Sequence, residues 1–147
     1  MPSSRNIVLD ASVFHGIIFE TGIGFKVYLK LLRSNDTIML SKSLLVHYKD
    51  HFQKKIRDPN LVLGRIISGD HCVDNWIQKL HALRKLVIVE ARTIEIDTHG
   101  KDRVVYDTAF GGACDLIITT NSRHFPIGDN LFTFRIITPS DYLEEQD

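Results

Sequence analysis

At residues 7–12 the chain reads Ile7-Val8-Leu9-Asp10-Ala11-Ser12, an apolar run that ends at once in polar side chains. A second apolar run, LIITTN at residues 116–121, ends in hydroxyl and amide side chains. Short continuous apolar runs are typical of strands buried on both faces of a parallel sheet. The carboxyl ends of such strands share one edge, where open α/β sheets bind their ligands. We therefore expect the polar residues after both runs to meet in space and form a site.

Strand-like runs alternate with helical patterns along the rest of the chain. We expect strands at residues 7–10, 37–40, 86–91, 116–119 and 134–137. Apolar residues at helical spacing predict either two helices or a loop followed by a helix over residues 13–33. The same spacing predicts single helices at residues 44–52, 58–67, 74–83 and 103–111. Such alternation predicts one domain over residues 1–147, built on a parallel, doubly wound sheet.

Several polar or glycine-rich stretches punctuate these elements. Ser41 or Ser43 can cap the helix that follows the second strand. We predict loops at Gly22-Ile23-Gly24 and at residues 97–102. Pro139 is expected to end the last strand, and residues 144–147 are expected to fray.

Composition narrows the classes of protein that the chain can belong to. Eighteen Lys and Arg residues balance eighteen Asp and Glu residues, so overall charge does not indicate a polyanionic partner, and any nucleic-acid contact must come from local basic clusters. Two cysteines, Cys72 and Cys114, are too few for a disulfide framework and predict buried thiols. Neither a signal peptide nor a membrane-spanning run is recognisable, so we expect a cytoplasmic protein with no membrane partner.

A second carboxylate, Asp102, precedes the helix expected at residues 103–111. It could simply cap that helix by accepting hydrogen bonds from free backbone N–H groups. Alternatively, the helix begins at the same sheet edge as Asp10, and the two carboxylates gather there. Carboxylates brought together repel one another unless a cation lies between them, and a hard divalent metal is the usual solution.

Four segments in order resemble the PIN domain family, in particular its branch of toxins from prokaryotic toxin–antitoxin pairs. They are VLDASVF, SKSLLVHY, KDRVVYDTAFGGACDLIITTNSRHF and IITPSDYL. The resemblance implies a three-layer α/β/α sandwich with a central, mostly parallel sheet. It also implies a metal-dependent endoribonuclease, in which acidic residues hold Mg²⁺ or Mn²⁺ ions that activate water against an RNA phosphodiester.

The resemblance assigns roles to residues at both strand ends. Asp10 matches the first acid of the family, Asp102 the third, and Asn121 the fourth position, where this branch often has Asn. These three would be the metal ligands. Ser12 and Thr119 match the small polar residues that flank the site and orient ligands or waters.

His47 departs from the family pattern, which usually has Glu in the helix after the second strand. In the catalytic site, the His47 imidazole would offer the metal a nitrogen ligand in place of a carboxylate oxygen. Mg²⁺ prefers oxygen ligands, whereas Mn²⁺, Fe²⁺ or Zn²⁺ accept nitrogen more readily. Either the metal preference differs from that of the family or the activity is weakened. The alternative function is therefore a weakened or inactive PIN-like module that binds RNA or a protein partner.

The resemblance also implies partners, namely an RNA substrate, an antitoxin protein and a second copy in a homodimer. Basic residues that could contact phosphates are Lys42, Lys54, Lys55, Arg57, Lys101, Arg103 and Arg123. Those beside proposed site residues or strand ends are the best candidates: Lys42, Lys101 and Arg123.

Other patterns are less favoured as functional sites. His47 and His51 have a spacing that can bind a transition metal on one helix, but such pairs are more often surface residues. Asp115 precedes its strand and so should lie at the far edge with a structural role, while Asp107 should face solvent or the rim of the site. A phosphate-accepting receiver domain would need an acidic pair after the first strand, whereas Asp10 stands alone.

Overall fold

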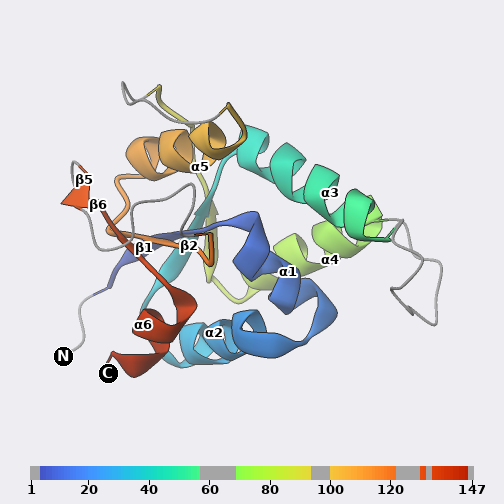
Figure 1. Ribbon diagram of the computed structural model, residues 1–147, viewed down its shortest axis with the longest axis horizontal. Helices are drawn as coiled ribbons and strands as arrows, with labels where there is room; N and C mark the ends of the chain where they lie inside the picture. Colours follow the sequence, from blue (N-terminus) through green and yellow to red (C-terminus); the bar gives the residue numbers. More distant parts are fainter. Residues whose placement is uncertain (1–3, 57–68, 94–99, 122–129, 132–133, 146–147) are drawn as a thin grey trace.

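The computed structural model describes residues 4–56, 69–93, 100–121, 130–131 and 134–145 (Figure 1). Its strands are β1 (Asn6–Leu9), β2 (Thr37–Leu40), β3 (Leu86–Ile88), β4 (Leu116–Ile118), β5 (Asn130–Leu131) and β6 (Phe134–Ile137). Its helices are α1 (Ala11–Phe19), α2 (Gly22–Arg33), α3 (Lys42–Ile56), α4 (Gly69–Ala82), α5 (Gly100–Gly111) and α6 (Pro139–Glu144). No helix in these ranges has both the length and the apolar character that a bilayer span requires.

The strands form one sheet in the order β3-β2-β1-β4-β6-β5. Every neighbouring pair is parallel except β5 and β6, which are antiparallel. At the centre of the sheet, Ile7 pairs with Leu116 and Leu9 with Ile118, so the two apolar runs lie side by side and end at the same edge. The side chains of both runs are buried, as expected for central strands covered on both faces.

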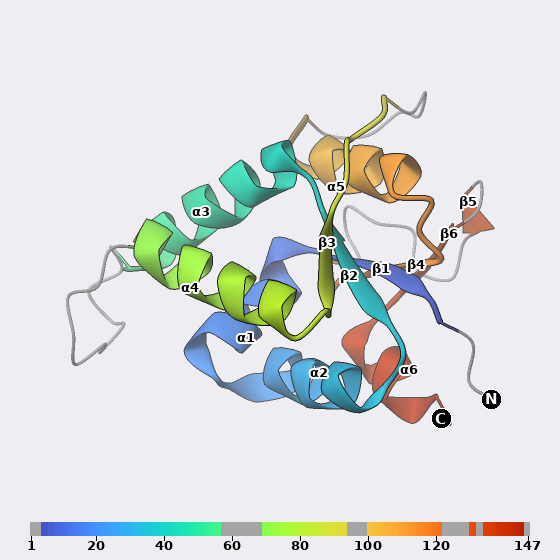
Figure 2. The ribbon, with the colours of Figure 1, turned by 180° about the vertical axis from the view of Figure 1, so that it is seen from behind.

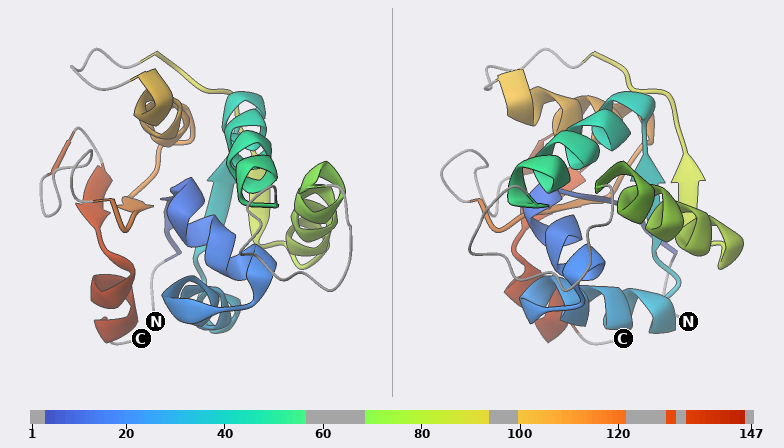
Figure 3. Two further views of the ribbon diagram at one scale, coloured as in Figure 1. Left: turned by 45° about the vertical axis from the view of Figure 1, so that its right-hand side comes forward. Right: turned by 90° about the vertical axis from the view of Figure 1, so that its right-hand side faces the viewer.

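Helices cover both faces of the sheet, which confirms the three-layer α/β/α arrangement. α5 packs on β1, β2 and β4 from one face (Figure 1). The helices that connect β1 to β2 and β2 to β3 cover the other face, because crossovers between parallel strands are right-handed. Within that layer α1 lies between α2 and α3 (Figure 3), and α6 packs against α2.

The glycines predicted to form a loop instead begin α2, so that prediction is wrong. Gly22 has φ +66°, which suits a glycine at the entry to the helix. Gly24 allows α2 to approach α1 closely: a Cβ on Gly24 would lie 3.0 Å from the Cα of Gly16, and one on Gly16 would lie 2.8 Å from the Cα of Gly24. Gly16 and Gly24 thus allow the two helices to pack closely, and the local sequence around each glycine does not reveal this role.

Element boundaries differ from the sequence prediction mainly at the helix starts. α1 begins at Ala11, α4 at Gly69 and α5 at Gly100, which is two, five and three residues before the respective predicted start. The first turn of a helix lies outside the repeating apolar stripe, so hydrophobic spacing misses it. β3 ends at Ile88 rather than at residue 91. The short helix predicted at residues 58–67 lies outside the described residues.

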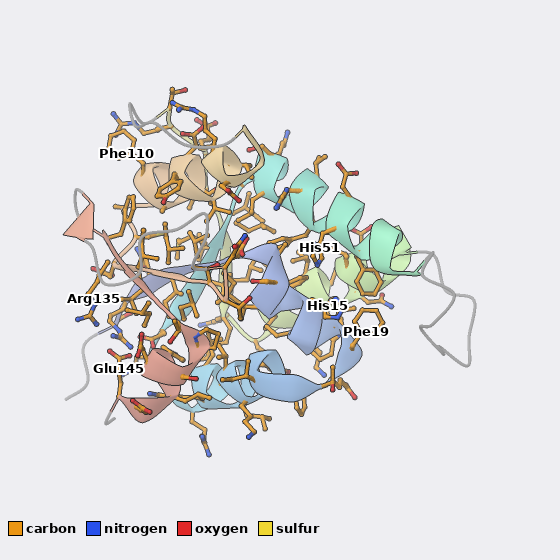
Figure 4. All side chains as sticks on the ribbon, in the orientation of Figure 1. His15, Phe19, His51, Phe110, Arg135 and Glu145 are labelled. Carbon is orange, nitrogen blue, oxygen red and sulfur yellow. The ribbon has the colours of Figure 1, made fainter. Side chains whose placement is uncertain are left out.

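The chain continues past the last strand into α6, which the sequence analysis did not predict. Thr138 and Asp141 form a capping box: the Thr138 hydroxyl accepts from the Asp141 N–H at 3.1 Å, and the Asp141 carboxylate accepts from the Thr138 N–H at 3.1 Å. Pro139 does end the strand, and it also occupies the first position of α6, where proline is favoured. Glu145 follows the helix, 3.5 Å from Arg135 (Figure 4), so the expected fraying is wrong for this residue.

A polar network at the amino edge of the sheet ties α6 to β1, α2 and the start of β2. Arg5 donates to both carboxylate oxygens of Asp36, at 3.2 and 3.1 Å, and to both of Glu145, at 3.1 Å each. The Tyr142 hydroxyl donates to Asp36 at 2.7 Å. The buried Lys30 ammonium donates to the main-chain carbonyls of Tyr142 and Glu145. Burial, with Asp36 beside it, raises the pKa of the Tyr142 hydroxyl above its usual value.

We expect Gly24→Ala to lower the free energy of unfolding by about 1–3 kcal/mol, because the added methyl group would force α1 and α2 apart. Urea denaturation followed by circular dichroism measures the change. Lys26→Ala, at an exposed position on the same helix, is the matched control and should stay within about 0.5 kcal/mol of the parent. Equal stability of the parent and Gly24→Ala would contradict the close-packing role.

Candidate functional site at the carboxyl ends of β1 and β4

Asp10 lies directly after β1, where it starts α1. Its N–H donates to the Ile118 carbonyl at 3.0 Å, which extends the pairing of β1 with β4 by one residue. Its carboxylate Oδ1 accepts from the N–H of Ala11 at 2.9 Å and so caps α1. The residue is 6% exposed, so the carboxylate is held in a nearly buried position.

Two hydroxyl groups hold the other oxygen of this carboxylate. Ser12 Oγ donates to Asp10 Oδ2 at 2.9 Å, and Thr119 Oγ1 donates to the same atom at 2.8 Å. Each hydroxyl also accepts a backbone N–H from the turn after β4: Ser12 from Thr120 at 3.4 Å and Thr119 from Asn121 at 3.0 Å. The polar residues after the two central strands therefore meet, as the sequence analysis expected.

The hydrogen bonds within the described part of the chain leave Asp10 with capacity for one further ligand. A carboxylate offers about four lone-pair sites, and these bonds use three of them, one on Oδ1 and two on Oδ2. The remaining site on Oδ1 could bind a cation or a water molecule. Because the other three bonds fix the rotamer, that remaining lone pair has a defined direction.

Asp102 belongs to the first turn of α5, two residues after the helix begins at Gly100. It is therefore inside the helix and not at the capping position that the sequence analysis considered. A carboxylate is favoured there because the N-terminal end of a helix carries partial positive charge. Asp102 is 6% exposed, on a helix that packs on β1 and β4 and contacts α3.

A buried pair of hydroxyl groups connects α5 to the end of β2. Ser41 follows β2 and caps α3, since its Oγ accepts from the Leu44 N–H at 3.1 Å. The same Oγ lies 2.6 Å from Thr108 Oγ1, which in turn donates to the Val104 carbonyl at 2.7 Å. Ser41 is thus the cap, which resolves the alternative with Ser43. Thr108 was not singled out from the sequence; its only local signal is a polar residue at an inward position of α5.

His47 lies on α3, and the next residue along the chain contacts the region around Asp10. That residue is Tyr48, whose ring stacks on Phe14 at 4.4 Å between centroids and whose hydroxyl donates to the Leu9 carbonyl. Burial, and secondly the charge of Asp10, raise the pKa of Tyr48 well above its usual value. His47 itself is half-buried. The sequence indicated Tyr48 only as a core residue, because the partner of its hydroxyl lies on another element.

His51, one turn after His47, lies at the contact between α3 and α1. Its ring meets that of His15 edge-on, with 5.8 Å between centroids, and His15 lies 4.5 Å from Phe19 (Figure 4). The His51 ring thus packs against His15 of α1. The sequence analysis did not single out His15, since only the packing of the two helices brings these rings together.

Other candidate residues lie away from this edge or take part in ion pairs. Asp115 accepts from the Asn6 N–H at 2.9 Å at the opposite edge of the sheet, in agreement with its predicted structural role. Asp107 is half-buried, with its carboxylate 3.9 Å from the Arg103 guanidinium. Lys42 is exposed at the first position of α3. The remaining phosphate-contact candidates lie outside the described side chains: Lys54, Lys55, Arg57, Lys101 and Arg123.

The donor atoms at this edge suit a hard divalent cation held by few protein ligands. Within the described ranges, no three His, Cys, Asp or Glu side chains form a group that could hold a metal ion. Mg²⁺ is commonly bound through one or two carboxylates and keeps several waters. Asp10, with its remaining lone pair on Oδ1, and the buried Asp102 could supply such carboxylates, and the hydroxyl and amide oxygens nearby could orient the waters.

Comparison of the chain with protein-family models and with curated protein sequences finds no match. The class of the protein therefore comes from its architecture: a doubly wound α/β domain with a polar site at the carboxyl ends of its two central strands.

We expect Thr119→Val to lower the free energy of unfolding by about 1–3 kcal/mol, because it removes a donor to the Asp10 carboxylate and leaves the Asn121 N–H without its acceptor. Chemical denaturation provides the measurement. Thr37→Val, the same change at the half-buried start of β2, is the control and should be nearly neutral. A loss at position 119 no larger than at position 37 would contradict this account of the hydroxyl.

Proposed function

We propose that the protein is a metal-dependent endoribonuclease of the PIN type. The observation that supports this most directly is the state of Asp10, a nearly buried carboxylate whose rotamer is fixed by hydrogen bonds from Ala11, Ser12 and Thr119. Metal-binding carboxylates are commonly oriented by hydrogen bonds of this kind. A purely capping aspartate would need only the bond to the backbone.

In the proposed site Asp10 and Asp102 bind the cation, and Asn121 binds it or one of its waters. When bound, the cation would lower the pKa of a water and stabilise charge on the scissile phosphate. Ser12 and Thr119 keep the Asp10 carboxylate oriented. His47 would complete the site or carry a proton.

The surroundings of the site favour a polyanionic substrate. α1 and α3 begin directly after β1 and β2, at the carboxyl edge of the sheet, so their N-terminal N–H groups lie at that edge, and helix N-termini attract phosphate. Lys42 is exposed at the first residue of α3 and would contact the RNA backbone. The proposal further includes an antitoxin protein that neutralises the enzyme and a homodimer as the working form.

The alternative is a PIN-like module that binds RNA or a protein partner and has lost catalysis. The feature that favours it is His47, an imidazole where the resemblance implies a carboxylate. This alternative retains the fold and the RNA-binding edge but predicts no metal-dependent cleavage.

Asp10→Asn and Asp102→Asn should each reduce cleavage of single-stranded RNA by at least about 100-fold, because each removes a carboxylate from the cation site. Cleavage is followed on end-labelled RNA in the presence of Mg²⁺ or Mn²⁺, with circular dichroism as the check on folding. Asp74→Asn, which removes only a surface ion pair with Lys49, is the matched control and should cleave normally. Unchanged cleavage in both site variants would refute the assignment.

His47→Glu separates the two candidate functions. If the parent is an active enzyme with an altered metal preference, the added carboxylate should raise Mg²⁺-dependent cleavage relative to Mn²⁺-dependent cleavage. Absence of cleavage in both proteins, together with no calorimetric binding of millimolar Mg²⁺ or Mn²⁺, would instead support the binding module.

A further inference from the structure

The two buried carboxylates of the candidate site lie on separate elements, and α3 is bonded to the element or strand end that carries each of them. Asp10 follows β1, whereas Asp102 belongs to α5. α3 continues from the end of β2 (Figure 2) and packs against both α1 and α5. The placement of α3 therefore bears on the separation of the two carboxylates.

The pairing of β1 with β2 ends before the carboxyl edge of the sheet. It stops at Ile7 with Ile38, whereas the pairing of β1 with β4 continues to Leu9 with Ile118. The Arg5 carbonyl accepts from the first N–H of β2, so by the alternation of a strand the Leu9 carbonyl also points toward β2. At the edge of the sheet, this carbonyl receives a hydrogen bond from a side chain of α3.

That side chain is Tyr48, whose hydroxyl donates to the Leu9 carbonyl. Its ring is 2% exposed and stacks on Phe14 of α1, which fixes where the hydroxyl lies. The Leu9 carbonyl belongs to the peptide group that joins Leu9 to Asp10, and a peptide group is planar. The hydroxyl of Tyr48 therefore ties the backbone of Asp10 to α3.

A second hydroxyl contact ties the start of α3 to α5. Ser41 Oγ lies 2.6 Å from Thr108 Oγ1, and both residues are buried. Thr108 donates its hydroxyl hydrogen to the Val104 carbonyl, so Ser41 is the donor in the contact between the two hydroxyls. Ser41 also accepts from the Leu44 N–H and so caps α3. The helix that carries Asp102 is thus bonded to the same helix as the backbone of Asp10.

We propose that these two contacts are positioning contacts, which act through α3 to set the separation of Asp10 and Asp102 at which a divalent cation binds. This inference rests on the proposed function, because it concerns the cation site of the same enzyme. A Mg²⁺ ion demands oxygen ligands at about 2.0–2.1 Å in a near-ideal octahedron, so a small shift of one carboxylate weakens its binding. Tyr48 and Thr108 do not themselves bind the cation.

Tyr142 provides a matched comparison for Tyr48. Its hydroxyl donates to Asp36 at 2.7 Å, and the residue is fully buried at the opposite edge of the sheet. Removal of either hydroxyl leaves a buried acceptor without that donor and so destabilises the fold. A positioning role differs from a merely structural one in that only the loss at Tyr48 changes the dependence on the cation.

Tyr48→Phe keeps the ring and removes the hydroxyl. The Mn²⁺ concentration that gives half-maximal RNA cleavage should rise about tenfold, while the rate at saturating Mn²⁺ stays close to that of the parent. Tyr142→Phe should leave the half-maximal concentration unchanged, even where denaturation shows a similar loss of stability. An equal rise in both variants, or no rise in Tyr48→Phe, would overturn the proposal.

Substitution of Thr108 tests the contact with α5 by rescue. Thr108→Val removes the hydroxyl and should also raise the half-maximal Mn²⁺ concentration about tenfold. Thr108→Ser keeps the hydroxyl and should restore the parent value, although it removes a buried methyl group and so costs stability. Identical metal dependence in the Val and Ser variants would contradict a role for the hydroxyl.

Calorimetric titration with Mn²⁺ separates this inference from the proposed function. An active parent whose variants keep its metal dependence refutes the positioning role alone. A parent that binds Mn²⁺ without cleaving RNA refutes the nuclease, and the dissociation constants of the same variants then decide the positioning role by the same tenfold criterion. A parent that neither binds Mn²⁺ nor cleaves RNA refutes both.

Discussion

The hydrogen bond from Thr119 to Asp10 is the constraint on which the carboxyl edge of the sheet, with the candidate site, depends. It joins residues 109 positions apart and fixes the end of β4 against the end of β1. The same carboxylate accepts from the Ala11 N–H and so caps α1. The Tyr48 hydroxyl of α3 donates to the carbonyl of Leu9, the residue just before Asp10. Two strands, β1 and β4, and two helices, α1 and α3, are thereby oriented around one carboxylate, so a change of its rotamer would disturb the donors that surround it.

A second polar network stabilises the opposite edge of the sheet. Arg5 joins Asp36 to Glu145, so the first strand, the start of β2 and the end of α6 are held together. Lys30 and Asp36 are buried there, and buried charges are tolerated only when they are paired and hydrogen-bonded. The apolar strands therefore run between two polar clusters, one around Arg5 at the amino edge of the sheet and one around Asp10 at the carboxyl edge.

The two side edges of the sheet are not equivalent. At one, β5 pairs antiparallel with β6 and covers it. At the other, β3 presents outward backbone groups and exposed Val87 and Ile88.

The apolar runs around Ile7, Ile38, Ile117 and Ile136 determined the central strands from the sequence alone, because a continuous buried run is a local signal. The polar ends of two of these runs also predicted the position of the site. The capping box after β6 was a local signal as well, and α6 could have been predicted had Pro139 been read as a helix start instead of only a strand end.

Tertiary structure alone decided the packing of Gly24 against α1 and the partners of Tyr48, Thr108 and Glu145. Each of these contacts joins residues that are distant along the chain, and local propensity carries no information about such a pairing until the sheet and helices have assembled.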